Sequence, residues 1–328
     1  MKHLYWVFIA LFLFSCNDSD VSPYEEVLES PEFAAITDSI RKEPNRDDLY
    51  FRRAIQLNTA NHTAPALEDF QKAWSLNKLE PYATGVGNIL LEKKPDSAVK
   101  FLSQATRELP NSLFLKLTLA RAYESLNKID DALAVSQEML DMDSTQINAL
   151  VLRADLLEKK GDTTGMIATL EKAYSLIPSN RLISERLAYN YAETKNPRAI
   201  SMADQLLRGD SLEQFADPFY IKGLYYANTR SYEKAIEQFD NTIRRDHRYL
   251  SAYIEKGKVL LDQKKTDAAL QTFQLANRIT PSYPDAWYWI GQCLELKGQK
   301  QEAKLNYEKA YSLDKTFTEA REAAEKIK

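Results

Sequence analysis

The chain has 328 residues, of which 44% are hydrophobic and 27% are charged, with 43 Lys and Arg against 47 Asp and Glu. Its net charge of −4 disfavours nucleic acids and anionic membrane surfaces as binding partners. Two cysteines cannot form a disulfide scaffold, and three histidines offer little for metal or acid–base chemistry. We therefore expect no cofactor and no metal site, and a non-enzymatic function is favoured.

Residues 1–15 have the layout of a secretory signal peptide. Lys2 and His3 precede an uncharged apolar run from Leu4 to Phe14. At about 1.5 Å per residue, this run covers about half of a bilayer hydrocarbon core about 30 Å thick. A transmembrane helix is therefore a poor interpretation of this segment.

The apolar run ends at Leu13-Phe14-Ser15-Cys16. These residues resemble the lipobox of bacterial lipoproteins, in which a small residue precedes an invariant cysteine, although Phe14 is bulkier than the residue usual there. The resemblance implies that cleavage removes residues 1–15 and leaves Cys16 carrying acyl chains such as palmitate. These chains would anchor the protein to a bacterial cell envelope, with the outer membrane as the expected location. The alternative is an ordinary signal peptide followed by an unrelated cysteine.

Two further segments precede the main part of the chain. Residues 16–31 are polar and acidic, which predicts a flexible tether. In residues 32–46, Phe33, Ile36 and Ile40 share one face of a predicted helix that ends before Pro44.

From residue 47 onward the sequence repeats with a period of about 34 residues. Three sets of residues recur at this spacing: Gly223, Gly257 and Gly291; Ala235, Ala269 and Ala303; and Phe239, Phe273 and Tyr307. Such a period indicates a helix pair that cannot bury its apolar face alone and stacks on its neighbours.

This spacing resembles the tetratricopeptide repeat, a helix–turn–helix of about 34 residues with small residues at positions 8, 20 and 27 and an aromatic residue at position 24. The resemblance covers residues 47–315 as eight repeats, which start at Asp47, Leu79, Leu113, Ile147, Arg181, Ala216, Leu250 and Pro284. It implies an all-α helical repeat solenoid that binds other proteins. Residues 32–46 would form an N-terminal capping half-repeat and residues 316–328 a C-terminal capping helix. Two polar ends favour a monomer that acts within a larger complex.

The fifth repeat departs from the pattern. Its second helix contains Asn196-Pro197, and Asp204 would occupy the aromatic position unless the register moves by one residue to Ala203. Its start and that of the sixth repeat are also further apart than the usual period. We expect an irregular turn or a bend in residues 196–218.

In tetratricopeptide repeats, positions 2, 5, 9 and 12 of the first helices line a concave groove, so the resemblance implies that partners bind there. The groove residues selected here are Phe114, Arg121, Asp155, Glu158, Glu185, Tyr189, Tyr220 and Tyr288. Acids outnumber bases over the full set of groove positions, and aromatic side chains supply amphipathic contact surface. The favoured ligand is therefore an extended peptide with basic and apolar residues.

These features lead to two functional hypotheses. The first is a lipid-anchored scaffold or adaptor that binds other proteins in an envelope assembly, secretion or motility complex. The second is an accessory protein that binds a glycan or a peptidoglycan fragment by stacking on Tyr189, Tyr220 and Tyr288. Catalysis is disfavoured, because no histidine accompanies Cys293, which we predict to be a buried structural thiol.

Overall fold

The computed structural model describes residues 23–210, 212 and 214–327. The predicted signal peptide and the predicted lipidation site Cys16 lie outside these residues. The described residues form α-helices joined by short turns and contain no strand, which confirms the predicted all-α helical repeat fold. No helix in this part of the chain combines the length and hydropathy needed to cross a membrane.

The chain divides into two compact units, residues 1–135 (unit 1) and residues 136–328 (unit 2), and the division falls inside α8 (Ile129–Met142). Before α8, unit 1 contains α1 (Glu25–Leu28), α2 (Ala34–Lys42), α3 (Asp47–Thr59), α4 (Thr63–Leu76), α5 (Glu80–Lys93), α6 (Pro95–Glu108) and α7 (Leu113–Ser125). After α8, unit 2 contains α9 (Ile147–Lys160), α10 (Thr163–Leu176), α11 (Arg181–Glu193), α12 (Arg198–Arg208), α13 (Asp217–Asn228), α14 (Tyr232–Arg245), α15 (Leu250–Asp262), α16 (Thr266–Ile279), α17 (Pro284–Leu296), α18 (Lys300–Leu313) and α19 (Thr318–Lys326).

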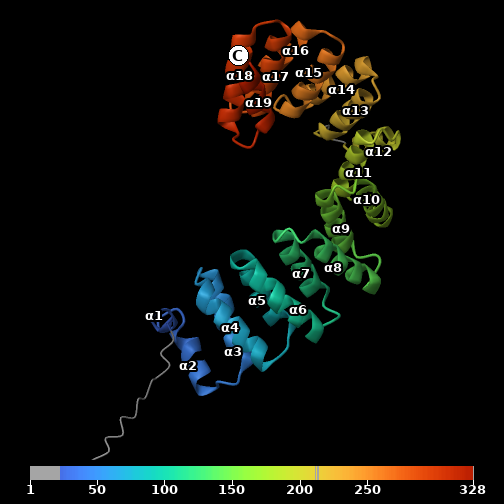
Figure 1. Ribbon diagram of the computed structural model, residues 1–328. Coiled ribbons are helices and arrows are strands. Elements are labelled where there is room, and N and C mark those ends of the chain that lie inside the picture. Colours follow the sequence, from blue (N-terminus) through green and yellow to red (C-terminus); the bar gives the residue numbers. More distant parts are fainter. Residues whose placement is uncertain (1–22, 211, 213, 328) are drawn as a thin grey trace, which may run out of the picture. The chain divides into compact units, whose positions relative to one another are not determined.

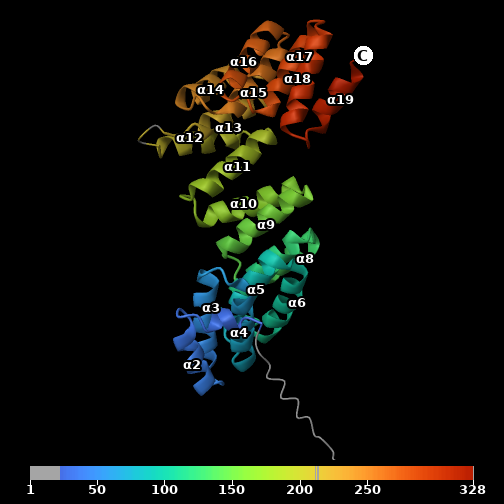
Figure 2. The ribbon, with the colours of Figure 1, turned by 90° about the vertical axis from the view of Figure 1, so that its left-hand side faces the viewer.

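Successive helices pack as pairs within each unit. In unit 2, α13 packs on α14, α15 on α16 and α17 on α18, and these pairs lie side by side in both views (Figure 1, Figure 2). The second helix of one pair also packs on the first helix of the next, as α14 does on α15. The apolar core is therefore continuous along the unit, as expected for stacked helical repeats.

The recurring glycines and aromatic residues contact each other inside each helix pair. A Cβ atom added to Gly257 would lie 2.2 Å from Cε1 of Phe273, and one added to Gly223 would lie 2.5 Å from Cε1 of Phe239. A Cβ atom added to Gly291 would lie 2.6 Å from Cε1 of Tyr307. Because these rings are fully buried, only a residue without a side chain lets the two helices approach this closely.

The turn inside a repeat also follows a fixed pattern. A residue with positive φ occupies the same position of the turn, at Asn61, Asn127, Gly161, Lys195, Arg230, Lys264 and Gly298. Glycine and asparagine adopt this left-handed conformation readily, whereas lysine and arginine do so at a cost. The packing of the helix pair therefore imposes the turn even where the local sequence disfavours it.

The N-terminal region corrects one prediction. Residues 16–31 were expected to form a flexible tether, but Glu25–Leu28 is helical, and the Thr37 hydroxyl donates a hydrogen bond to the Leu28 carbonyl at 2.8 Å. The tether prediction is therefore wrong for this described part of the segment. Composition alone missed these contacts because they come from α2, which follows later in the chain.

A buried ion pair joins the first helices of unit 1. The Arg53 guanidinium donates to both carboxylate oxygens of Asp69, at 2.7 and 2.8 Å, and to the Thr37 hydroxyl at 3.0 Å. All three side chains are buried. Burial raises the pKa of Asp69, although Arg53 opposes this shift. The ion pair links α3 to α4, and Thr37 extends the link to α2, the predicted capping half-repeat.

The first helices of the second and sixth repeats begin one residue after the predicted repeat starts Leu79 and Ala216, at Glu80 and Asp217. In the fifth repeat, Ala203 is fully buried, whereas Asp204 is ion-paired with Lys222 at 2.8 Å, so the register moves by one residue. The second helix, α12, has 11 residues where α14, α16 and α18 have 14, and the described residues between α12 and α13 (209, 210, 212 and 214–216) are not helical. The irregularity predicted for residues 196–218 is confirmed.

Candidate partner-binding face

The first helices of unit 2 share a surface that we call the first-helix face. It consists of Asp155 and Glu158 on α9, Leu182, Glu185, Tyr189 and Glu193 on α11, Tyr220 on α13, and Glu255 and Lys258 on α15. Within unit 2, α11 packs beside α13, and α13 packs beside α15. Phe114 and Arg121 lie on α7 in unit 1, where both side chains are exposed, and they are therefore not part of this surface.

The stripe along α11 contains the most exposed apolar residues of this face. Leu182, Glu185, Tyr189 and Glu193 recur every three or four residues, so they lie on one side of the helix. Leu182 is 77% exposed and Tyr189 is 41% exposed, while Leu187 on the opposite side is fully buried. An exposed apolar stripe on a helix whose other side is already packed is typical of a protein-binding surface.

Arginines neutralise part of the acidity that the sequence predicts for this face. The Arg186 guanidinium forms ion pairs with Asp155 and Glu158 of the neighbouring helix, the second at 2.7 Å. Arg186 occupies position 6 of its repeat. It was therefore not included when the charged residues at the four groove positions were counted. The adjacent helix therefore supplies one positive charge for two carboxylates, which reduces the predicted negative charge at Asp155 and Glu158 without removing it.

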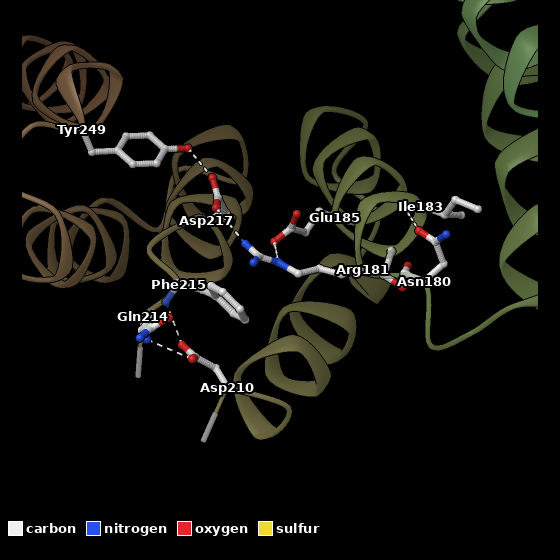
Figure 3. Close-up of polar contacts among 10 residues, drawn as sticks. Asn180, Arg181, Ile183, Glu185, Asp210, Gln214, Phe215, Asp217 and Tyr249 are labelled. Atoms are coloured by element: carbon white, nitrogen blue, oxygen red, sulfur yellow. Dashed lines mark hydrogen bonds and ion pairs between the residues drawn. The ribbon is translucent and has the colours of Figure 1, made fainter. Parts of the chain in front are cut away.

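A second arginine pairs with acidic side chains near the start of α11. The Arg181 guanidinium donates to Glu185 at 2.6 Å and to Asp217 at 3.4 Å, and Figure 3 shows it between these two carboxylates. The Tyr249 hydroxyl donates to the other Asp217 oxygen at 3.0 Å. Burial raises the pKa of Glu185 despite the hydrogen bond from Arg181.

Glu193 and Glu255 form a further acidic part of the face. Lys258 pairs with Glu255 at 2.8 Å, and among the described residues Glu193 forms no ion pair. Burial, followed by the nearby Glu255, raises the pKa of Glu193, and Lys258 partly opposes the shift. Burial and the same two glutamates raise the pKa of the Tyr189 hydroxyl. The two glutamates and Lys258 together carry two negative charges and one positive charge, so this part of the face keeps a net negative charge.

The other two predicted groove tyrosines are packed against neighbouring rings. Tyr220 lies 4.9 Å from the Tyr249 ring, and Tyr288 lies 5.0 Å from the Phe317 ring, between ring centroids. These partners belong to a column that the sequence analysis missed, Phe215, Tyr249, Tyr283 and Phe317, which recur with the period of the repeat just before successive first helices. A search for that period would have revealed this column. The packing leaves less ring surface for a glycan on Tyr220 and Tyr288.

The Asp210 side chain, just after α12, contacts residues that precede α13. Its carboxylate accepts the backbone N–H groups of Gln214 at 2.9 Å and Phe215 at 2.7 Å (Figure 3). The Arg181 guanidinium carbon lies 3.3 Å from the centroid of the Phe215 ring. A pocket of about 320 Å³ lies beside this contact, lined by residues that include Tyr174, Met202, Leu206 and Gly209.

The described residues suggest no metal-binding chemistry. No cluster of His, Cys, Asp or Glu within them is arranged to hold a metal ion. Cys293 is fully buried, and burial raises the pKa of its thiol to about 12. The prediction of a buried structural thiol is therefore confirmed, because the reactive thiolate form is disfavoured at this position.

Family comparisons agree with the repeat architecture. Residues 147–180 and 284–317 match one family model and residues 220–284 match another, and both models describe the tetratricopeptide repeat. Residues 147–180 and 220–317 thus contain tetratricopeptide repeats. A solved tetratricopeptide repeat protein from Parabacteroides merdae is similar in fold, with a TM-score of 0.62 and 17% identity over 74% of this chain and 96% of that one.

Curated relatives resemble this chain over most of its length. DnaJ homolog subfamily C member 7 of Mus musculus is 23% identical over 285 residues, which are 82% of this chain and 56% of that protein. Anaphase-promoting complex subunit 7 of Homo sapiens is 20% identical over 293 residues, which are 88% of this chain and 51% of that protein. The chain thus spans about half the length of these relatives.

Proposed function

We propose that this chain is a lipid-anchored tetratricopeptide-repeat scaffold that binds an extended segment of another protein in a bacterial cell envelope. The observation that carries the proposal is the unpartnered stripe on α11, where Leu182 is 77% exposed and Tyr189 is 41% exposed. Exposed leucine and tyrosine side chains beside charged groups supply the apolar anchors and polar rim of a protein interface.

The relatives support a scaffold function. Anaphase-promoting complex subunit 7 is by its name a component of a multiprotein complex, and it resembles this chain over 88% of the chain's length. The repeats offer no enclosed catalytic centre among the described residues, whereas they do offer a long series of first helices. We therefore propose an adaptor role in an envelope assembly, secretion or motility complex.

The proposed location rests on the sequence around Cys16. A short basic start, an apolar run of eleven residues from Leu4 to Phe14, and the Ser15-Cys16 pair support export and lipidation. Acyl chains on Cys16 would hold the folded units near a membrane, with the outer membrane as the proposed site.

Site-specific photo-crosslinking in living cells tests the proposed binding face. A photoreactive residue replaces Tyr189 on α11, and the matched control replaces Leu275 on α16, which is 44% exposed but lies on a second helix. We expect one envelope protein to be captured from position 189 and not from position 275. The purified captured protein should then bind the Tyr189→Ala variant less tightly than the original chain. Equal capture at both positions would contradict the scaffold proposal and favour the glycan-binding alternative.

A separate experiment tests the anchor. The Cys16→Ser variant should appear in the soluble fraction and incorporate no labelled palmitate, whereas the original chain should be labelled and sediment with membranes. Membrane association of the variant equal to that of the original chain would exclude lipidation of Cys16 as the anchor.

A further inference from the structure

Among the described residues, every acidic side chain of the first-helix face except Glu193 forms an ion pair within the chain, so Glu193 is the position best suited to a cation supplied from outside. Asp155 and Glu158 have Arg186 as their counter-ion, and Glu185 has Arg181. Lys258 is held by Glu255 at 2.8 Å. Glu193, at the end of α11, is exposed and forms no ion pair among the described residues, while Glu255 adds a second carboxylate nearby.

Aromatic side chains border this position. Tyr189 lies one turn before Glu193 on the same side of α11, and burial, followed by the charge of Glu193, raises the pKa of the Tyr189 hydroxyl. Tyr220 lies on the neighbouring helix α13, and burial, followed by the charge of Glu255, raises the pKa of its hydroxyl. Tyrosine rings next to carboxylates suit a lysine or arginine side chain, because the ring face attracts the cation while its alkyl stem covers apolar surface.

The apolar end of the stripe is Leu182, which is 77% exposed. Leu182 and Glu193 are 11 positions apart in one helix, which corresponds to about 16 Å at about 1.5 Å per residue. An extended peptide covers this distance in about five residues at about 3.3 Å each. A segment lying along α11 can therefore contact both ends of the stripe at once.

We infer that the partner segment is extended and carries an apolar side chain that packs on Leu182 and a lysine or arginine, four or five positions away, that pairs with Glu193. This inference rests on the proposed scaffold function and specifies the chemistry of its ligand. Charge complementarity selects the occupant, because a segment with an acidic residue at that position would meet two carboxylates.

Selection from a random displayed peptide library tests the inference, with the immobilised full-length chain as bait. We expect enriched peptides to share an apolar residue and a basic residue four or five positions apart. An enriched synthetic peptide should bind the Glu193→Gln variant about tenfold more weakly, because a charge-assisted hydrogen bond is lost. The affinity for this variant should also depend less on salt concentration.

Matched variants on second helices separate a local effect from a general one. Glu237→Gln removes an exposed carboxylate from α14, and Leu305→Ser removes a leucine that is 64% exposed on α18. Neither should change peptide affinity, whereas Leu182→Ser should lower it about tenfold. Circular dichroism before and after each substitution shows whether the variant keeps the helical fold.

The outcomes distinguish the inference from the function on which it rests. Enriched peptides that lack a basic residue, or that bind the Glu193→Gln variant as tightly as the original chain, would overturn the inference and leave the scaffold proposal intact. Failure of the chain to enrich any peptide, together with equal crosslinking from positions 189 and 275, would overturn both.

Discussion

Repeats six to eight and the fifth repeat build the same helix pair by different packing. In α13–α18, a glycine of the first helix lies against a fully buried ring of the second, as in Gly257 and Phe273. In the fifth repeat the buried ring belongs to the first helix: Tyr191 is fully buried, and its hydroxyl donates to Glu171. Arg198 lies 4.7 Å from the same ring.

The difference shows where each region obtains its stability. The regular repeats depend on close packing of large rings, which loses free energy steeply when atoms are removed or added. The fifth repeat adds to its buried core a set of polar contacts around Arg181, Asp210 and Phe215, in which the Arg181 side chain stays partly accessible to solvent. The fifth repeat also contains the α11 stripe proposed to bind a partner, so its irregular connection lies next to the binding surface.

The largest contrast should come from removing one phenylalanine ring in each region. Phe273→Ala should lower the free energy of unfolding of unit 2 by about 3–5 kcal/mol, because the ring is fully buried against Gly257. Phe215→Ala should cost about 1 kcal/mol, mainly the loss of the cation–π contact with Arg181. Urea denaturation measures both values, and equal losses would contradict the proposed difference in packing.

A glycine-to-alanine substitution should have opposite signs in the two regions. Gly257→Ala should destabilise unit 2 by about 1–2 kcal/mol, since the strain of overpacking against Phe273 exceeds the gain in helix propensity. Gly209→Ala should stabilise it by about 0.5 kcal/mol, because φ is −79° and the nearest atom to the new Cβ is 3.5 Å away.

Thermal melting of the two single variants gives these signs directly. The double variant Gly257→Ala/Phe273→Leu should recover part of the loss, because the smaller side chain makes room for the added methyl group. No recovery would mean that the glycine serves another purpose than clearance for the ring.

A smaller, local effect is expected from Asp210→Ala. This change removes the acceptor of two backbone N–H groups, while the matched Asp246→Ala in a regular connection removes one, from Arg248 at 2.9 Å. Hydrogen exchange should therefore accelerate more at Gln214 and Phe215 in the first variant than at Arg248 in the second. The reverse order would show that Asp210 does not hold the connection.

The same connection should loosen in acid. Burial acts to raise the pKa of Asp210, but hydrogen bonds from Phe215 and Gln214 and the charges of Arg245 and Arg181 lower it overall. Its contribution is therefore complete above the unfolded-state pKa of about 3.9, and is lost as the pH falls through the lower folded-state value. Exchange at Gln214, corrected for intrinsic rates, should rise in this acid range, and Asp210→Ala should abolish the rise.

The helical repeat architecture was predictable because it leaves a periodic record in the sequence. Gly223, Gly257 and Gly291 recur together with the rings that pack against them. The same glycine–ring contact is therefore encoded three times at the spacing of the repeat. The one-residue shift at Ala203 could also be anticipated, because only a small residue and an acid were available at that position. The aromatic residues from Phe215 to Phe317 also recur at the spacing of the repeat. A search for that period would have identified them.

The electrostatics of the candidate site required the folded structure. Sequence alone identified Asp155, Glu158 and Glu185 as acidic groove residues, but not that Arg186 and Arg181 would pair with them. An ion pair depends on distances between side chains of different helices, and these distances are set by how the helices pack. The sequence by itself therefore determined which residues form the repeating helix pairs, whereas only the tertiary structure decided that Glu193 remains without a counter-ion among the described residues.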